Sequence, residues 1–132
     1  DVEAELLPWC AANGIGVVVY SPMQTGLLTG AFTCERIAAL PADDWRRASP
    51  YFVEPELTRN LALVEGLRAV AARSGRTMAE LAVAWVLRRP EVTSAIVGSR
   101  RPGQVDETAP AADRPLTPQE DREIAELLQE RS

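Results

Sequence analysis

Paired arginines are the residues of this chain whose type and spacing point most directly to chemistry. All 14 positive charges come from Arg, and three adjacent pairs stand apart at positions 46–47, 88–89 and 100–101. A guanidinium group presents a planar fork of donors that matches phosphate and carboxylate oxygens. In a chain of net charge -5, isolated pairs suit contacts with single anionic groups, whereas a nucleic-acid binder needs a basic stripe. We therefore expect anion contacts and no nucleic-acid partner.

The chain lacks two of the side chains that most often act as acids, bases or nucleophiles. Its 132 residues include no His and no Lys, and its tyrosines are Tyr20 and Tyr51. A reaction that needs an imidazole or an amine must therefore obtain that group from elsewhere. Cys10 and Cys34 are too few for a disulfide framework, and the apolar helical pattern around Cys10 favours a buried free thiol.

The composition is that of a globular domain with a hydrophobic core. Hydrophobic residues make up 46% of the chain and charged residues 25%. No stretch reaches the ~18 apolar residues of a membrane span, and no signal-peptide pattern opens the sequence. We expect no membrane partner and a cytoplasmic location. The sequence begins at Asp1 within a helical pattern, so we also expect it to be part of a longer protein.

Two short segments read as strands that position the loops behind them. Residues 15–20 form a continuous apolar, β-branched run, and residues 93–97 read as a second short strand that ends at Gly98. Runs without polar alternation are typical of parallel strands that are buried on both faces. A long loop follows Ser21. Residues 35–54 contain Pro41 and Pro50 and are followed by Pro55, so they read as a second loop with one helical turn near 36–40.

Helical patterns surround both strands. Thr77 and Glu80 form a capping box, as do Thr117 and Glu120, and Gly75 is placed to end a helix. We expect helices over 2–13, 56–73 and 77–89, a short one over about 102–107, and a last one from 117 onward. This alternation predicts an α/β fold. Two strands that are buried on both faces need further strands beside them, so the chain accounts for roughly a quarter of a larger sheet or barrel.

Two segments of this sequence resemble the aldo-keto reductase family. VYSPMQTGLLTG at 19–30 resembles the segment that follows the family's seventh barrel strand, and AIVGSRRPGQVDE at 95–107 resembles its eighth strand and the next helix. Between them, DWRR at 44–47 and LAVAWVL at 81–87 are similar to bacterial members. The resemblance implies that residues 1–132 are a partial domain, the C-terminal half of a (β/α)8 TIM barrel that carries cofactor-binding loops.

The family transfers a hydride from NADPH to an aldehyde or ketone. Its catalytic Tyr, Lys, Asp and His come from the N-terminal half of the barrel, so the resemblance gives this chain no catalytic residue and no metal ligand. Tyr51 does not stand in the context of the catalytic Tyr. The resemblance thus implies NADP(H) as cofactor, a small carbonyl compound as substrate, and a missing N-terminal barrel half as partner.

The cofactor contacts that the resemblance implies fall on the two loops. Tyr20 matches the aromatic residue that stacks on the nicotinamide, Arg100 and Arg101 match the loop that holds the adenosine 2′-phosphate, and Thr108 stands where the family often has Asn. The other matched positions are Ser21, Met23, Gln24 and Thr25 at the pyrophosphate, Gly98 and Ser99 at the 2′-phosphate, and Gln104 and Glu107 at the adenosine.

Several loop residues admit two interpretations. Gly26 and Gly30 are either turn glycines or part of the pyrophosphate loop. Arg47 either folds over the cofactor, as a basic residue does in some family members, or is solvated. A further set is expected to line a substrate pocket, while two tryptophans on helical patterns are expected to pack in the interior. The pocket set is Leu27, Trp45, Tyr51 and Phe52, and the tryptophans are Trp9 and Trp85.

Two alternatives remain to the hypothesis that the chain is part of an oxidoreductase. One is a barrel fragment that binds a nucleotide or a partner protein without chemistry. The other is a gene remnant without a function of its own. Helix caps, turns and apolar faces agree with one another along the sequence, which argues against a remnant.

Overall fold

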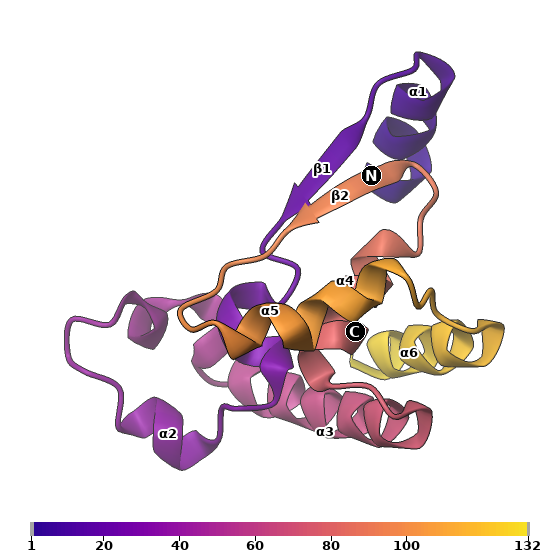
Figure 1. The fold of residues 1–132 in the computed structure, drawn as a ribbon. Helices are drawn as coiled ribbons and strands as arrows, with labels where there is room; N and C mark the ends of the chain where they lie inside the picture. Colours follow the sequence, from indigo (N-terminus) through magenta and orange to yellow (C-terminus); the bar gives the residue numbers. More distant parts are fainter. Residues whose placement is uncertain (1, 132) are drawn as a thin grey trace.

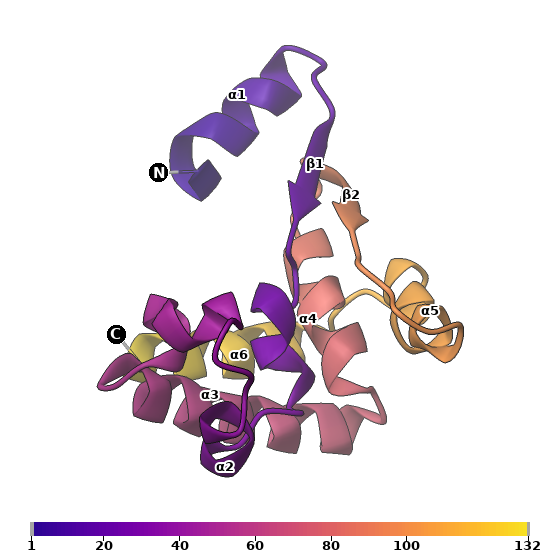
Figure 2. The same ribbon diagram turned by 90° about the vertical axis from the view of Figure 1, so that its left-hand side faces the viewer.

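Two parallel strands and a body of helices make up the computed structural model, which describes residues 2–131. β1 (Val17–Tyr20) pairs with β2 (Val92–Ile96), with Val18 opposite Ser94 and Tyr20 opposite Ile96. Figures 1 and 2 show the strands and α1 (Leu7–Ala12) projecting away from the helical body. The predicted α/β class and the parallel pairing are confirmed.

The helices begin and end close to the positions that the caps predict. α3 (Glu56–Ser74) ends at Gly75, whose φ of 64° is in the left-handed region that glycine tolerates. α4 (Met78–Leu87) begins with the Glu80 N–H donating to the Thr77 hydroxyl, 2.9 Å away. The other α-helices are α2 (Cys34–Ala38), α5 (Gly103–Thr108) and α6 (Pro118–Arg131), and a π-helical turn (Val2–Leu6) precedes α1.

The 3-10 turns lie in the connections between these elements. They are Gln24–Thr29, Trp45–Ala48, Pro50–Phe52 and Ala109–Ala112. Residues 35–54, predicted as a loop with one helical turn, contain α2 and two of these turns. Among residues 2–131, no helix is both long and apolar enough to cross a lipid bilayer.

The core lies between α3, α4 and α6, beneath residues of the connecting loops. Its largest fully buried side chains are Phe52, Leu81 and Val64. α6 packs closely on α3 at Gly66. A Cβ added at this glycine would lie only 2.5 Å from a Leu127 methyl carbon. Trp85 packs against this core as predicted, with the Arg88 guanidinium carbon 3.6 Å from the centroid of its ring.

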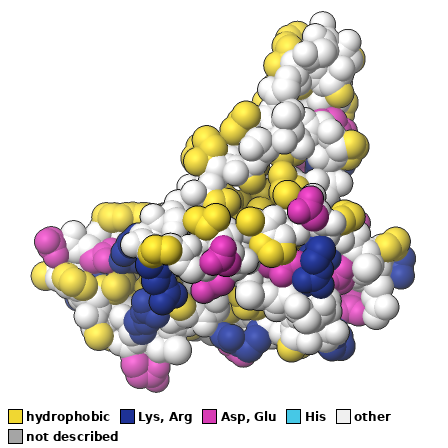
Figure 3. Space-filling model, viewed as in Figure 1, with side chains coloured by type: hydrophobic (Ala, Val, Ile, Leu, Met, Phe, Trp, Pro, Cys, Tyr) yellow, Lys and Arg dark blue, Asp and Glu magenta, His cyan; other side chains and the backbone are white. Residues whose placement is uncertain are grey.

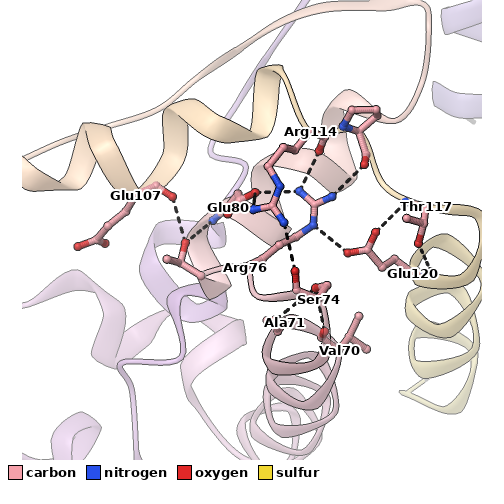
Figure 4. Close-up of polar contacts among 11 residues, drawn as sticks. Val70, Ala71, Ser74, Arg76, Glu80, Glu107, Arg114, Thr117 and Glu120 are labelled. Atoms are coloured by element: carbon pink, nitrogen blue, oxygen red, sulfur yellow. Dashed lines mark hydrogen bonds and ion pairs between the residues drawn. The ribbon is translucent and has the colours of Figure 1, made fainter.

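A buried ionic cluster joins α4 to α6 (Figure 4). The Arg76 guanidinium donates to Glu80 Oε1 and to Glu120 Oε1, each at 2.8 Å, and to the carbonyl oxygens of Arg114 and Pro115. The side chains of Arg76, Glu80 and Glu120 are nearly inaccessible to solvent. Such buried charges are tolerated only when they are paired and hydrogen-bonded, and here every partner is provided by the fold.

The strands are open in this chain, as expected for a part of a larger sheet. Burial on both faces was predicted only with further strands beside them, and here Val18 is 56% exposed and Ile96 60% exposed. Within the described residues, no third strand and no helix covers these side chains, so hydrophobic groups lie open along the projecting strands (Figure 3). Trp9 was expected to pack internally but is also exposed, because α1 extends beyond the helical body (Figure 2).

Candidate functional site

The two loops singled out in the sequence leave the sheet at the same edge. Because β1 and β2 are parallel and Tyr20 is opposite Ile96, the loops that begin at Ser21 and at Val97 start side by side. They then diverge: the 3-10 turn Gln24–Thr29 and helix α5 both contact α4 and lie on either side of it in Figure 2. One helix therefore supports both loops.

The loop after β1 has an unusual backbone. Ser21, Gln24 and Thr25 have φ values of 54°, 45° and 57°, and these are the non-glycine residues with positive φ in the described chain. Such conformations are sterically disfavoured for L-residues and cluster at ligand sites, where the surrounding structure holds them in place. The Thr25 hydroxyl donates to the Gln24 carbonyl oxygen at 2.7 Å. The strained backbone and the family-like sequence motif therefore fall in the same loop.

Gly26 and Gly30 are accounted for as turn glycines. Their φ values are 99° and 71°, a region that side-chain-bearing residues rarely adopt. At Gly30 an added Cβ would lie 2.9 Å from Arg68 Nη2, so the Arg68 side chain would have to shift. That same nitrogen donates to the Gly30 carbonyl oxygen at 2.8 Å, so Arg68 holds the end of the loop.

Tyr20 ends β1 with its aromatic ring open to one side. Its side chain is 81% exposed, although it stands between the half-buried Val19 and the strained Ser21. An exposed ring at the end of a parallel strand offers a flat apolar surface against which a planar ligand can stack.

Arg100 and Arg101 differ from nearly all the other arginines. Their side chains are exposed, and neither makes an ion pair or a side-chain hydrogen bond within residues 2–131. Arg122 shares this property. Every other guanidinium donates to a carboxylate or a carbonyl oxygen of the protein. In Figure 3, basic side chains gather over the turn between β2 and α5.

The remaining residues of the second loop bond among themselves. Gln104 Oε1 accepts from the backbone N–H groups of Arg100 and Arg101, at 2.7 and 3.3 Å. The Ser99 hydroxyl donates to the Arg101 carbonyl oxygen. Thr108, where the family often has Asn, is buried and donates to the carbonyl oxygens of Gln104 and Val105. Its hydroxyl therefore points into its own helix rather than toward a ligand.

Helix α5 is too short for its N-terminus to attract an anion strongly. It spans six residues and continues as a 3-10 turn, so its aligned dipoles add little to the attraction of an anion. Any anion affinity of this loop rests on the guanidinium groups. Thr77, which the sequence marks only as a helix cap, also donates to the Glu107 carbonyl oxygen at 3.0 Å and fixes α5 to α4.

The connection between α2 and α3 brings charges toward the second loop. Hydrogen bonds from the Arg46 side chain and backbone lower the pKa of Asp44 to about 2, and the charge of Arg100 acts in the same direction. Arg46 also stacks on Phe32, with its guanidinium carbon 5.2 Å from the ring centroid. Arg47 donates to the Leu40 carbonyl oxygen at 2.7 Å, so its side chain is held within its own loop.

Half of the predicted pocket residues do not line a surface. Leu27 and Phe52 are buried in the core, where Phe52 packs edge to face with Phe32. Loop residues become core residues here because the turns that carry them fold over α3 and α4. Trp45 and Tyr51 are exposed. Cys10 is buried with a free thiol, as predicted, and Cys34 is exposed and free.

Comparisons with known proteins agree with this architecture. The sequence model of the Aldo/keto reductase family matches residues 1–129. A glycerol dehydrogenase from Gluconobacter oxydans has the same fold, with a TM-score of 0.87 and 30% identity over 98% of this chain and 39% of that one. The two-stranded parallel sheet and its helices thus match a portion of an (β/α)8 barrel enzyme, and the predicted fold class is confirmed.

Curated relatives give the same result at the sequence level. A probable aldo-keto reductase 1 from Glycine max is 32% identical over 97% of this chain and 36% of that protein. An NADH-specific methylglyoxal reductase from Escherichia coli strain K12 is 34% identical over 97% of this chain and 39% of that protein. A probable voltage-gated potassium channel subunit beta from Arabidopsis thaliana is 36% identical over 85% of this chain and 34% of that protein.

This chain belongs to the aldo/keto reductase family. It spans about two fifths of the length of the relatives that it matches.

Proposed function

We propose that this chain forms the C-terminal half of an NADP-dependent aldo-keto reductase and holds the cofactor while the N-terminal half supplies the acid–base residues. Oxidoreductase relatives support the reaction class. The absence of His and Lys from the sequence supports the division of labour, because the family's proton donor needs both kinds of side chain nearby. A small carbonyl substrate and a cytoplasmic location stay predictions of the sequence.

The unpaired arginines carry this proposal. Within residues 2–131, Arg100 and Arg101 are exposed guanidinium groups without a hydrogen-bond or ion-pair partner, whereas almost all the other arginines are engaged. Two planar donors on adjacent residues suit a phosphate dianion, which accepts several charge-assisted hydrogen bonds. The residues present therefore fit the 2′-phosphate that distinguishes NADPH from NADH.

The first loop would hold the other end of the same cofactor. NADPH, when bound, supplies the hydride. Tyr20 offers a ring on which the nicotinamide can stack and so fixes the face that is presented to the substrate. Ser21, Gln24 and Thr25 bring small or polar side chains and a strained backbone to the pyrophosphate, and Met23 covers an apolar side of the cofactor. We propose contacts to the 2′-phosphate for Gly98 and Ser99 and to the adenosine for Glu107, whereas the Gln104 side-chain oxygen already bonds its own loop.

The name of the Escherichia coli relative bears directly on the choice of cofactor. That protein is named as NADH-specific, although it is 34% identical to this chain. Family membership alone thus leaves the choice open, and the argument for NADPH rests on the two guanidinium groups.

The cofactor preference of the whole enzyme tests the proposal. In the double variant Arg100→Ala, Arg101→Ala the affinity for NADPH should fall by about 100-fold, because each charge-assisted hydrogen bond contributes about 1.5–3 kcal/mol. The affinity for NADH should change little. Arg122→Ala removes another exposed, unpaired arginine, from α6, and is the matched control. Equal affinity of the unmodified enzyme for both cofactors would overturn the proposal.

A second candidate function is partner binding without chemistry. It is favoured by the Arabidopsis thaliana relative, which is named as a probable channel subunit. Hydride transfer separates the two functions: an enzyme that oxidises NADPH with a reactive aldehyde is a reductase, and one that binds NADPH without turnover supports the second candidate.

A further inference from the structure

We propose that Gln104 is a positioning residue that selects the 2′-phosphate indirectly, by holding the backbone from which Arg100 and Arg101 extend. This inference rests on the proposed function and assigns Gln104 a role other than direct contact with adenosine.

The first observation is the direction of the Gln104 side chain. Its Oε1 atom accepts from two consecutive backbone N–H groups, those of Arg100 at 2.7 Å and Arg101 at 3.3 Å. An oxygen that is occupied by two donors of its own loop has little capacity left for a ligand. The side chain is half-buried, whereas the five residues of the loop before α5 that lead up to it, 98–102, are exposed.

The second observation is that Gln104 itself is fixed to the helical body. Its carbonyl oxygen accepts from the buried Thr108 hydroxyl at 3.1 Å. One residue before Thr108, the Glu107 carbonyl oxygen accepts from Thr77, which also caps α4. Hydrogen bonds at Thr77, Thr108 and Gln104, joined by the backbone of α5, therefore connect the start of α4 to the amides of Arg100 and Arg101.

The third observation is that little else holds this loop. A Cβ added at Gly98 or Gly103 would meet no atom within 4 Å, so the backbone there is surrounded by open space. The Ser99 hydroxyl bond to the Arg101 carbonyl oxygen lies within the loop and does not attach it to the body. Backbone hydrogen bonds from Gln104 to Arg101 and from Val105 to Pro102 hold the turn into α5 but leave the N–H groups of Arg100 and Arg101 without another acceptor within residues 2–131. We therefore expect the backbone at both arginines to be more mobile without the Gln104 side chain.

Positioning of this kind affects one cofactor more than the other. Ordering a loop when a ligand binds reduces affinity, and a preformed loop avoids that cost. Only NADPH carries the phosphate that both guanidinium groups must reach together. Loss of the Gln104 bonds should therefore weaken NADPH binding and leave NADH binding nearly unchanged.

The test compares three variants of the whole enzyme. Gln104→Ala removes the acceptor, Gln104→Glu keeps an acceptor at the same reach, and Gln129→Ala removes an exposed Gln from α6 as the control. Hydrogen exchange at the Arg100 and Arg101 amides is measured without cofactor, and dissociation constants are measured for NADPH and NADH. We expect Gln104→Ala to exchange faster at both amides and to bind NADPH about tenfold more weakly, with NADH changed less than about twofold.

Gln104→Glu should restore slow amide exchange, and its added negative charge should still weaken NADPH binding. The control should match the unmodified enzyme in all three measurements. Unchanged amide exchange in Gln104→Ala, or an equal loss of affinity for NADPH and NADH, would overturn the positioning role. Failure of the proposed function is distinguishable, because it would already be seen as a lack of NADPH preference in the unmodified enzyme, while the exchange measurement needs no cofactor.

Discussion

At the scale of single residues, the chain concentrates unusual local features around the edge where both strands end. Tyr20 leaves most of an aromatic ring exposed, and the next residue, Ser21, has a positive φ. Exposed aromatic rings and strained backbone both cost free energy in a protein that has no use for them. We propose that the bound cofactor covers the ring and uses the turn, while barrel strands beside β1 would cover the neighbouring apolar side chains.

Replacement of Tyr20 tests this explanation in the whole enzyme. Tyr20→Ala should weaken cofactor binding and slow hydride transfer several-fold, because a stacked ring pair contributes about 0.5–1.5 kcal/mol. Tyr20→Phe, the control, keeps the ring and should stay near the unmodified rate. The ring contributes little to this chain's own core, so stability to urea should change little in either variant. If single-turnover kinetics are identical for Tyr20→Ala and the unmodified enzyme, Tyr20 has no role in stacking and is an ordinary strand residue.

At the scale of elements, α4 is the support of the candidate site and α6 stabilises α4. The loop after β1 and helix α5 both contact α4. The start of α4 is joined to α6 through Arg76, which bonds Glu80 on one side and Glu120 on the other (Figure 4). Glu120 also completes the α6 capping box, since its Oε2 accepts from the Thr117 N–H at 2.7 Å.

This junction makes stability depend on pH through Glu120. Burial alone would raise the pKa of Glu120, but hydrogen bonds from Arg76 and Thr117 outweigh it and lower the pKa to about 2. A lowered pKa in the folded state stabilises the fold above the unfolded value of about 4.3, and this contribution is lost as the pH falls toward 2. Glu120→Gln should therefore reduce the free energy of unfolding by about 1–3 kcal/mol at pH 7.

Urea unfolding of the whole enzyme between pH 7 and pH 2.5 measures this effect. The difference between Glu120→Gln and the unmodified enzyme should shrink as the pH falls through the acidic range. Glu126→Gln neutralises an exposed carboxylate on the same helix and should be nearly neutral for stability at every pH. A difference for Glu120→Gln that stays constant over the whole pH range would contradict the linkage to its carboxylate.

At the scale of the whole molecule, the two strands are the least protected part of the structure. Val18, Tyr20 and Ile96 expose apolar surface along a sheet of two strands (Figure 3). Both outer edges of this sheet present unpaired backbone groups within the described chain. Open edges and apolar faces together favour pairing with another chain.

The chain produced by itself should therefore be inactive and associate. Purified fragment should fail to oxidise NADPH in the presence of a reactive aldehyde, because no imidazole or amine is present in its sequence. Its mass in solution should exceed that of a monomer. Addition of an N-terminal barrel half should restore turnover, and the same half with its catalytic tyrosine replaced is the control. A soluble monomer that turns over the aldehyde would contradict this prediction.

Local sequence signals were enough to predict most of the helices and strands and the loops between them. Caps at Thr77 and Thr117, the glycine stop at Gly75 and the β-branched runs predict helices and strands because these signals act within a few residues of one another. The two loop motifs likewise identify the family, since their order and spacing are properties of the chain alone.

The burial and the direction of individual side chains depend on how the elements pack together. Leu27 and Phe52 stand in loop segments, and nothing local distinguishes them from Trp45, which stays exposed. Gln104 stands at a position that suits a ligand contact, yet its amide bonds its own loop. Burial and bonding partners depend on residues that are distant in sequence and adjacent in space, so a local pattern cannot contain them.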